Sequence, residues 1–378
     1  MLDHPEWRGK PLIVGGDADS RGVVSTCSYE ARRFGVHSAM ASAEARRLCP
    51  QAIWTHGHFD RYREVSAQVM AILADETPRV ERVSIDEAFI DITPGRFAPE
   101  DPLFVARRIS DRVAALGVTC SIGVGCNKTV AKIASERDKP FGLTIVRPGT
   151  EQRFLAALPV SAMSGIGRSA EERLRRMRIY TLGELSRAPE STLASIFGVN
   201  GERMRQRALG LEISEVTSLD EEREVKSVSN ERTFAKDLTE REDIEAAIAL
   251  LGESVGRRLR RQGLTGGTVT LKLKYSYGSG RTAQRRLPHP TDDENIFVAV
   301  ALELLDNIWQ EGMHVRLAGI GMSDFNHQGG IQTDLFCEVD DRGAQSSDRR
   351  DLSVAIDAVR DKFGDTALSF GRQSRFND

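Results

Sequence analysis

Cysteine is scarce in this 378-residue chain, and long apolar runs are missing. The five cysteines are scattered, and no Cys-x-x-Cys or matching histidine pair indicates a zinc site or a disulfide framework. We interpret them as reduced thiols. No apolar stretch reaches the roughly 20 residues of a membrane-spanning helix, and nothing resembles a signal peptide. We therefore expect a cytoplasmic protein with no membrane partner.

Charge is close to balanced, with a formal net charge of −3, which by itself does not favour a nucleic-acid binder. The distribution is more informative than the sum. One interval, 257–286, contains no Asp or Glu but holds nine cations: Arg257, Arg258, Arg260, Arg261, Lys272, Lys274, Arg281, Arg285 and Arg286. Such asymmetry favours a local site for a polyanion, although an ordinary solvated sheet face would have the same composition.

The length predicts two or more domains. Up to about residue 160, helical patterns interleave with short strands, which we take as antiparallel, and this favours an α+β layer. From residue 226 to 325 the order of expected elements is strand, helix, strand, strand, helix, strand, a βαββαβ unit. In one of these strands Val269, Leu271 and Leu273 alternate with Thr270, Lys272 and Lys274, so we expect an apolar face and a cationic face.

Paired acids mark the centre of the first half of the chain. Two short β-rich runs meet near Asp86 and Glu87, within 80–92, so both carboxylates fall at or beside a turn. Two hard oxygen donors at one point suit Mg²⁺, which combines one or two carboxylates with substrate phosphates and waters. A charged hairpin turn without a metal is the alternative that this pattern alone leaves open.

Cations flank the paired acids in the sequence. Tyr29-Glu30-Ala31-Arg32 leaves the end of an expected strand, and Lys128 and Lys132 are i, i+4 neighbours on one face of an expected helix. A polyphosphate held by Mg²⁺ would need such groups close to the carboxylates. Solvated surface cations are the alternative for each of them.

Three motifs together carry a resemblance to a known family. They are Ser28-Tyr29-Glu30-Ala31-Arg32 with Phe34-Gly35-Val36, Ser84-Ile85-Asp86-Glu87-Ala88-Phe89-Ile90-Asp91, and the segment from Ser121-Ile122-Gly123-Val124-Gly125 to Ser135. In order and spacing they resemble the Y-family translesion DNA polymerases of the DNA polymerase IV type. The resemblance runs from about Pro11 to Phe336.

The resemblance implies a right-hand polymerase with a ferredoxin-like palm, small fingers, a helical thumb and a βαββαβ little finger. It implies error-prone, template-directed DNA synthesis across damaged DNA, catalysed by two Mg²⁺ ions. Asp86 would bridge both ions and Glu87 would bind the catalytic one. The incoming deoxynucleoside triphosphate would contact Thr26, Tyr29, Arg32 and Lys132. Metal ions about 3.5–4 Å apart clamp the attacking and leaving oxygens of such a phosphoryl displacement.

The same resemblance divides the chain into palm and fingers (1–160), thumb (161–215), linker (216–225), little finger (226–325) and tail (326–378). In the thumb, Gly165 and Gly167 open an arginine-rich helix, so backbone N–H groups are free to receive a phosphate. This pattern resembles a helix-hairpin-helix on primer–template DNA, and a second such unit is expected near 197–201. In the little finger, Arg285 and Arg286 would contact the DNA backbone.

A short peptide in the tail resembles the segment by which bacterial polymerases bind the sliding clamp. Gln332-Thr333-Asp334-Leu335-Phe336 would place Leu335 and Phe336 in an apolar pocket, with Gln332 at its rim. We expect a monomer whose lasting hold on DNA depends on the clamp. A helix over 352–363 is also expected, as a cap or extension.

The family's first strand carries a further metal-binding aspartate and the residue that excludes ribonucleotides, and it has no counterpart here. The chain starts at Met1-Leu2-Asp3-His4, and Asp3 is a poor substitute for that ligand. Our first expectation is that the true start lies upstream and that the whole protein is a polymerase. The alternative is a non-catalytic protein that binds DNA and the clamp. A metal-dependent phosphodiester hydrolase is a third hypothesis.

Overall fold

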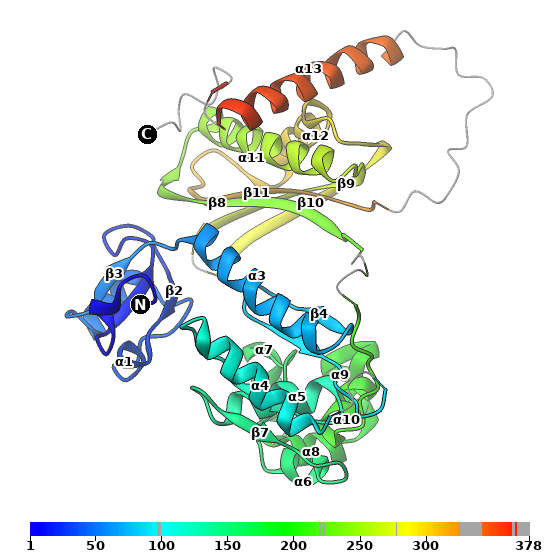
Figure 1. Cartoon of the computed structure of the whole chain (residues 1–378). Coiled ribbons are helices and arrows are strands. Elements are labelled where there is room, and N and C mark those ends of the chain that lie inside the picture. Colours follow the sequence, from blue (N-terminus) through cyan, green and yellow to red (C-terminus); the bar gives the residue numbers. More distant parts are fainter. Residues whose placement is uncertain are drawn as a thin grey trace. The chain divides into compact units, whose positions relative to one another are not determined.

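The computed structural model describes residues 1–96, 100–218, 221, 224–276, 278–325, 342–364 and 367–368, with the backbone alone for 342–351. The chain divides into two compact units, which are considered separately (Figure 1). The first comprises Met1–Lys10 and His56–Glu222, and the second comprises Pro11–Thr55 and Arg223–Asp378. The division near residue 222 falls inside the expected linker.

Short strands and long helices form the first half of the first unit. Strands β4 (Val80–Arg82) and β5 (Ala88–Ile90) pair antiparallel, and β6 (Ile122–Val124) and β7 (Leu143–Ile145) pair parallel. The helices are η1 (Pro5–Trp7), α3 (Phe59–Glu76), α4 (Pro102–Ala115) and α5 (Lys128–Arg137). The palm sheet implied by the resemblance is represented in the described residues by these two separate ladders.

Helix α4 illustrates how the sequence determines these elements. Asp101 caps it by accepting a hydrogen bond from the Leu103 amide at 2.8 Å, and Pro102 occupies the first turn, where its missing N–H costs nothing. Its buried face consists of Val105, Ile109 and Val113, which pack against Ile72 of α3. This apolar layer supports the β4–β5 hairpin because Ile90 packs against it.

A bundle of short helices completes the first unit. It contains α6 (Glu151–Ala156), η2 (Val160–Ala162), α7 (Arg168–Arg176), α8 (Leu182–Arg187), α9 (Glu190–Phe197), η3 (Gly198–Asn200) and α10 (Gly201–Leu209). Its core includes Leu155, Leu174, Leu182 and Leu193, and it continues into α5 through Val130 and Ile133. The helix that carries Lys128 and Lys132 is therefore packed between the ladders and the bundle.

The first segment of the second unit, 11–55, consists of a three-stranded sheet and two short helices. Its sheet has the order β2 (Val24–Cys27), β1 (Leu12–Gly15), β3 (Ile53–Thr55), and its helices are α1 (Tyr29–Arg32) and α2 (Ser42–Leu48). Strand β3 runs parallel to β1, and β7 runs parallel to β6, so the expectation of antiparallel strands throughout was wrong. The reason is that helices connect the paired strands, and a helical crossover returns the chain in the same direction.

The rest of the second unit confirms the βαββαβ order. The elements are β8 (Ser227–Leu238), α11 (Arg241–Arg261), β9 (Gly266–Ser276), β10 (Ser279–Thr291), α12 (Glu294–Ile308) and β11 (Val315–Ser323). The sheet order is β10-β9-β11-β8, and α11 and α12 cover one face (Figure 1). Val269, Leu271 and Leu273 are fully buried beneath them, as the alternating pattern predicts.

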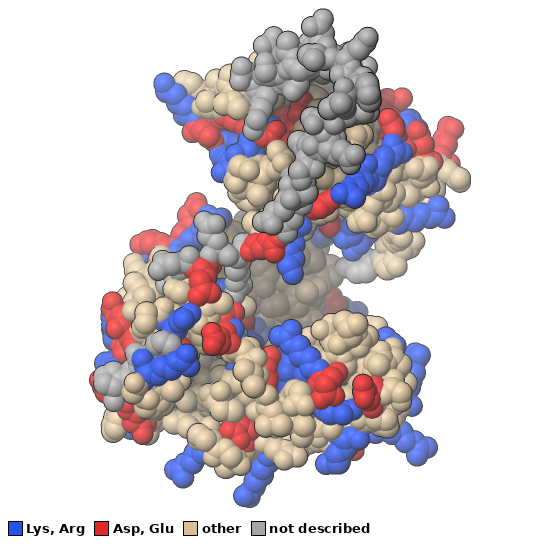
Figure 2. Space-filling model, turned by 90° about the vertical axis from the view of Figure 1, so that its right-hand side faces the viewer, with Lys and Arg blue, Asp and Glu red and all other residues tan. Residues whose placement is uncertain are grey.

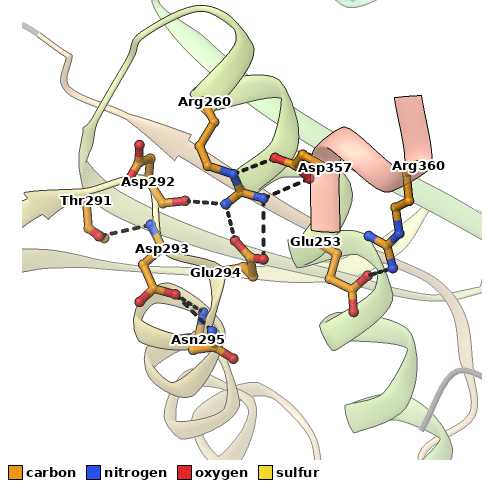
Figure 3. Close-up of polar contacts among 9 residues, drawn as sticks. All are labelled: Glu253, Arg260, Thr291, Asp292, Asp293, Glu294, Asn295, Asp357 and Arg360. Carbon is orange, nitrogen blue, oxygen red and sulfur yellow. Dashed lines mark hydrogen bonds and ion pairs between the residues drawn. The ribbon is translucent and has the colours of Figure 1, made fainter. Parts of the chain in front are cut away.

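A further helix, α13 (Arg342–Phe363), lies on α11 on the side away from the sheet (Figure 1). Charged side chains join the two helices (Figure 3). Arg260 of α11 bonds Asp357 at 2.7 Å and Glu294 at 2.5 Å, and all three side chains are at least 87% buried. Arg360 bonds Glu253 at 3.0 Å. Leu352 and Val354 of α13 are exposed, so this contact depends on charge pairs more than on apolar burial.

Two expectations from composition can be compared with the described residues. Cys27, Cys49, Cys120 and Cys126 are free thiols, as their scattered positions predict. Among the helices of the described residues, none combines the length and the apolar character needed to cross a bilayer.

Candidate active site

The paired acids lie at the tip of the β4–β5 hairpin, as the sequence predicts. The backbone N–H groups of Val83 and Ser84 both donate to the Glu87 carbonyl, at 2.9 and 3.1 Å, and these bonds close the turn. Asp86 is exposed, and its Oδ1 accepts a 2.6 Å hydrogen bond from the Ser84 hydroxyl. The side chain of Glu87 is 43% exposed. Both carboxylates therefore remain open to a ligand.

Helix α5 runs beside this hairpin and contacts it through two lysines one turn apart. The Lys132 ammonium contacts the Glu87 carboxylate, and the Lys128 ammonium contacts Glu81 on β4. Lys128 also lies 5.9 Å from the centre of the Phe89 ring. The i, i+4 spacing of the lysines is thus matched by acids at the base and the tip of the hairpin.

The environment of Lys132 favours its charged form. Partial burial opposes the charge, but the hydrogen bond and charge of Glu87, with a smaller contribution from Glu136 at 3.4 Å, raise the pKa of Lys132 above its ordinary value. The lysine is a permanent cation at neutral pH. It lies against one of the two proposed metal ligands, where a phosphate bound to that metal would also lie.

Gly123 explains how α5 comes close enough to place these lysines. A Cβ at this position of β6 would lie 2.0 Å from the carbonyl oxygen of Ala131, so only glycine allows the strand to contact the helix backbone. Asn127 caps the helix by accepting a bond from the Val130 amide at 3.0 Å. The Gly-Val-Gly and Asn-Lys parts of the motif therefore fix the register of Lys128 and Lys132.

A groove of about 680 Å³ extends from Lys132 to the glycine turn of the helical bundle. Lys132, Glu136 and Arg137 line one wall, and the residues 161–167 line the other. Gly165 and Gly167, the predicted DNA-binding glycines, thus share a groove with the predicted nucleotide-binding lysine. A nucleic-acid backbone in this groove would meet the cations Lys132 and Arg137 on one wall and backbone N–H groups of the glycine turn on the other.

The glycine turn has the geometry that the sequence predicts. Gly165 adopts φ = +95°, a conformation that strains other residues, and Gly167 caps α7 without a side-chain acceptor. The first N–H groups of α7 are therefore open to an anion. The second predicted turn forms η3, where Val199 is fully exposed. Arg173 of α7 instead bonds the Ile196 carbonyl, so this arginine joins the two hairpins.

The other predicted nucleotide-binding residues gather at the junction of β2 and α1 in the second unit. Thr26 and Arg32 are exposed, Tyr29 is 46% exposed, and the Arg32 guanidinium lies 5.8 Å from the centre of the Tyr29 ring. Ser28 caps α1 by accepting a bond from the Ala31 amide. Tyr29 and Arg32 lie side by side, and Thr26 is exposed near the end of β2; the convergence of the three residues with Asp86 and Glu87 stays a prediction.

The predicted DNA-binding arginines of the little finger point to opposite faces of the sheet. Arg285 contacts Glu303 of α12 on the helical side. Arg286, the next residue on β10, is 83% exposed, with Asp324 at 3.8 Å. On the open face Lys272 pairs with Glu231 at 2.8 Å. Figure 2 shows basic and acidic side chains interspersed over the face in view, which agrees with the near-neutral net charge.

Part of the acid-free basic interval does not offer its charges to a polyanion. Arg260 bonds Asp357 and Glu294, and Arg257 and Arg261 contact Asp361 of α13. The expectation that this interval marks a local site for a polyanion therefore does not hold for these three arginines. Asp357 and Asp361 lie about a hundred residues further along the chain and Glu294 lies 34 residues from Arg260, so local composition does not reveal these pairings.

Asp86 and Glu87 fit a divalent ion as a pair of hard oxygen donors. Across the described ranges, no cluster of three or more His, Cys, Asp or Glu side chains has a metal-binding arrangement. Asp3 bonds Arg61 at 3.1 Å. Asp86 and Glu87 are thus two candidate carboxylate ligands, and their role as metal ligands stays a prediction.

The predicted clamp-binding residues and two residues beside Asp86 complete the comparison with the sequence. Gln332, Leu335 and Phe336 of the predicted clamp-binding peptide lie outside the described residues. Sequence reasoning missed Ser66 and Arg82, which bond the carbonyls of Ile85 and Ser84 beside Asp86. The sequence gives only a weak sign of this role for Ser66, which is a serine in the middle of an apolar helical stripe.

Comparisons with known proteins agree with this geometry. Residues 1–136 match the model of the impB/mucB/samB family, and residues 225–335 match the C-terminal domain of that family. The first match contains the hairpin and all but the last residue of α5, and the second contains the βαββαβ unit.

Curated relatives cover most of the chain. It is 39% identical over 333 residues to the DNA polymerase IV of Lactococcus lactis subsp. cremoris strain MG1363, covering 87% of this chain and 91% of the relative. It is 36% identical over 377 residues to the DNA polymerase IV of Dehalococcoides mccartyi strain BAV1, covering 99% and 94%.

Solved structures share the fold. A Y-family DNA polymerase chimera has a TM-score of 0.73 at 24% identity, covering 86% of this chain and 95% of its own. DinB from Sulfolobus solfataricus has a TM-score of 0.55 at 24% identity, covering 86% and 94%. From its fold, its site and its curated relatives, we conclude that the chain belongs to the impB/mucB/samB family and is a translesion DNA polymerase of the Y family, of the DNA polymerase IV type.

Proposed function

We propose that Asp86 and Glu87 are the metal ligands of this polymerase and that it works with two Mg²⁺ ions. Family membership implies a divalent metal, and two adjacent carboxylates that remain open to solvent support Mg²⁺, which keeps waters and takes phosphate oxygens as further ligands. Asp86 would contact both ions and Glu87 one. When bound, the ions would stabilise the attacking and leaving oxygens of nucleotidyl transfer.

Lys132 is the residue that connects these carboxylates with a nucleotide, and its contact with Glu87 is the observation that carries the proposal. A lysine that neutralises Glu87 is already within reach of any phosphate that shares a metal with that carboxylate. Lys132 would then bind the triphosphate and balance the charge of the departing pyrophosphate. Its raised pKa ensures that the charge is present at neutral pH.

We further propose that Thr26, Tyr29 and Arg32 bind the same triphosphate. They form an exposed group with a hydroxyl donor, a phenol and a guanidinium at one end of a three-stranded sheet. Arginine suits phosphate because its planar donors form paired bonds. In this assignment, residues 1–160 are palm and fingers.

Primer–template DNA is the proposed macromolecular partner. Gly165 and Gly167 would bind backbone phosphates through free amides at the start of α7, in the thumb (161–215). After a linker (216–225), the little finger (226–325) would contact the duplex with the open face of its sheet. Arg286 is the exposed cation of the predicted pair, while Arg285 would have to leave Glu303.

The tail (326–378) contributes a proposed sliding-clamp contact through Gln332, Leu335 and Phe336, supported by the sequence pattern. We propose that the protein works as a monomer in the cytoplasm and is retained on DNA by the clamp. Binding of a fluorescent 330–338 peptide to a bacterial clamp, with Leu335→Ala and Phe336→Ala as a double variant, tests this assignment.

Primer extension tests the catalytic assignment. Asp86→Ala and Glu87→Ala should each abolish incorporation with Mg²⁺, whereas Asp91→Asn, a change to a carboxylate that bonds Thr93 on the same hairpin, should retain it. Unchanged incorporation by Asp86→Ala would refute the metal assignment. The non-catalytic alternative is not favoured, since the curated relatives that span the chain are polymerases. Cleavage of bare duplex would revive the hydrolase hypothesis.

A further inference from the structure

The turn that carries both carboxylates has little support of its own. Strands β4 and β5 are three residues each, and a two-stranded pair of this length is marginally stable in water. Asp86 is exposed and Ile85 is only half-buried, so packing does not fix the turn. Hydrogen bonds from neighbouring elements therefore add to the bonds within the turn in fixing the position of Asp86.

Ser66 of α3 supplies such a bond. Ser66 is 6% exposed, and its hydroxyl donates to the Ile85 carbonyl at 2.5 Å. Serine in the middle of a helix usually returns its hydroxyl to its own helix or to solvent. Here the hydroxyl leaves the helix and bonds the residue immediately before Asp86.

Arg82 supplies the second contact from the end of β4. Its Nε donates to the Ser84 carbonyl at 3.2 Å, and a terminal nitrogen donates to the Ser66 hydroxyl at 3.4 Å. Ser84 in turn donates to Asp86 through its own hydroxyl. Two consecutive carbonyls of the turn are thus bonded to one serine–arginine pair.

We propose that Ser66, together with Arg82, is a positioning residue for Asp86. The Ile85 carbonyl belongs to the peptide plane that joins Ile85 to Asp86. Fixing that plane fixes the direction in which the Asp86 side chain leaves the backbone. Ser66 touches no substrate in this role; it acts through the backbone of the turn. The inference rests on the proposed metal-binding function of Asp86.

Ser66→Ala tests the inference, with Ser186→Ala as the matched control. Ser186 is also a buried helical serine of the first unit, but its hydroxyl bonds Gly183 in its own helix. In Ser66→Ala we expect a roughly tenfold lower kcat and a several-fold higher Mg²⁺ concentration for half-maximal rate, because small misplacements of catalytic groups are costly. The KM for DNA should be little changed, and Ser66→Cys should be intermediate.

Amide hydrogen exchange provides a readout that is independent of catalysis. Exchange of the Val83 and Ser84 amides, which close the turn, should accelerate in Ser66→Ala and stay unchanged in Ser186→Ala. Identical exchange and Mg²⁺ dependence in the two variants would overturn the positioning role. If Asp86→Ala still incorporates nucleotides, the metal assignment fails instead, and exchange still reports whether Ser66 holds the turn.

Discussion

Lys132 on α5 contacts the carboxylate of Glu87, and one turn earlier Lys128 contacts Glu81 at the base of the same hairpin. The two lysines look equivalent in the sequence, but their partners give them different tasks. Glu81 is 13% exposed and also accepts a bond from the Thr217 amide, whereas Glu87 is 43% exposed at the tip. Lys128 holds structure together, and Lys132 faces the candidate metal site.

Replacing each lysine with methionine should therefore separate stability from catalysis. Lys132→Met should lower kcat/KM for the nucleotide by about 10²–10³, the usual loss for one charged donor in a reaction of this kind. Lys128→Met should reduce the free energy of unfolding by about 1–2 kcal/mol, because Glu81 loses its cationic partner at a largely buried site. Single-nucleotide incorporation and urea unfolding measure the two effects. Equal catalytic losses would contradict the distinction.

Arg285 and Arg286 allow a test of which sheet face contacts DNA. Arg286→Ala should reduce the slope of log affinity against log salt by about 1, since one phosphate contact is lost. Arg285→Ala should leave the slope unchanged, because its guanidinium is engaged with Glu303 on the helical face. Fluorescence anisotropy with duplex DNA over a salt series measures both. A larger effect for Arg285 would place DNA on the other side.

Asp357 should be the main attachment point of α13. Asp357→Ala leaves Arg260 buried with only Glu294 as its acidic partner, and breaking a buried charge pair costs about 3–5 kcal/mol of unfolding free energy. Asp361→Ala provides the control, because that carboxylate is 50% exposed and should matter much less. Chemical denaturation followed by circular dichroism measures the difference. Similar effects of the two substitutions would argue against a buried anchor.

Cys126 should react slowly with alkylating reagents although the residue as a whole is exposed. Burial of the thiol, with a smaller contribution from a hydrogen bond to Glu151, raises the pKa of Cys126 to about 11. The thiolate is the reactive form, so below pH 11 its alkylation rate should rise about tenfold per pH unit. Glu151→Gln should accelerate the reaction only partly, because burial is the larger cause. The rate is measured by mass spectrometry after iodoacetamide treatment at pH 8, 9 and 10. An alkylation rate that levels off within this range would contradict the raised pKa.

Periodicity and turn residues in the sequence were enough to predict the helices and strands that they define. The sequence was not enough where strand direction or side-chain pairing depends on residues far apart in the chain. The alternation in β9 was enough to assign its buried face, and the spacing of Lys128 and Lys132 was enough to place them on one helix face. The pairing of β3 with β1 depends on a crossover, so local patterns could not give its direction.

The same limit applies to side-chain roles. Arg260 looked like a phosphate contact because its nearest acids in space, Asp357 and Glu294, are remote in the sequence. Ser66 looked like a neutral helical residue because its partner, the Ile85 carbonyl, lies nineteen positions away. Composition reports which charges are present, and only the fold reports which are already neutralised.

The charge pairs of α13 differ in how far solvent reaches them, and this gives ionic strength a graded effect on the helix. Counterions screen the exposed Asp361 pairs far more than the buried bond between Arg260 and Asp357. With rising salt, the Asp361 pairs should weaken first, while the buried bonds of Asp357 and Arg360 keep the helix attached. A salt titration of DNA affinity would then also weaken the attachment of α13. DNA binding and the state of this helix should therefore be followed with separate probes.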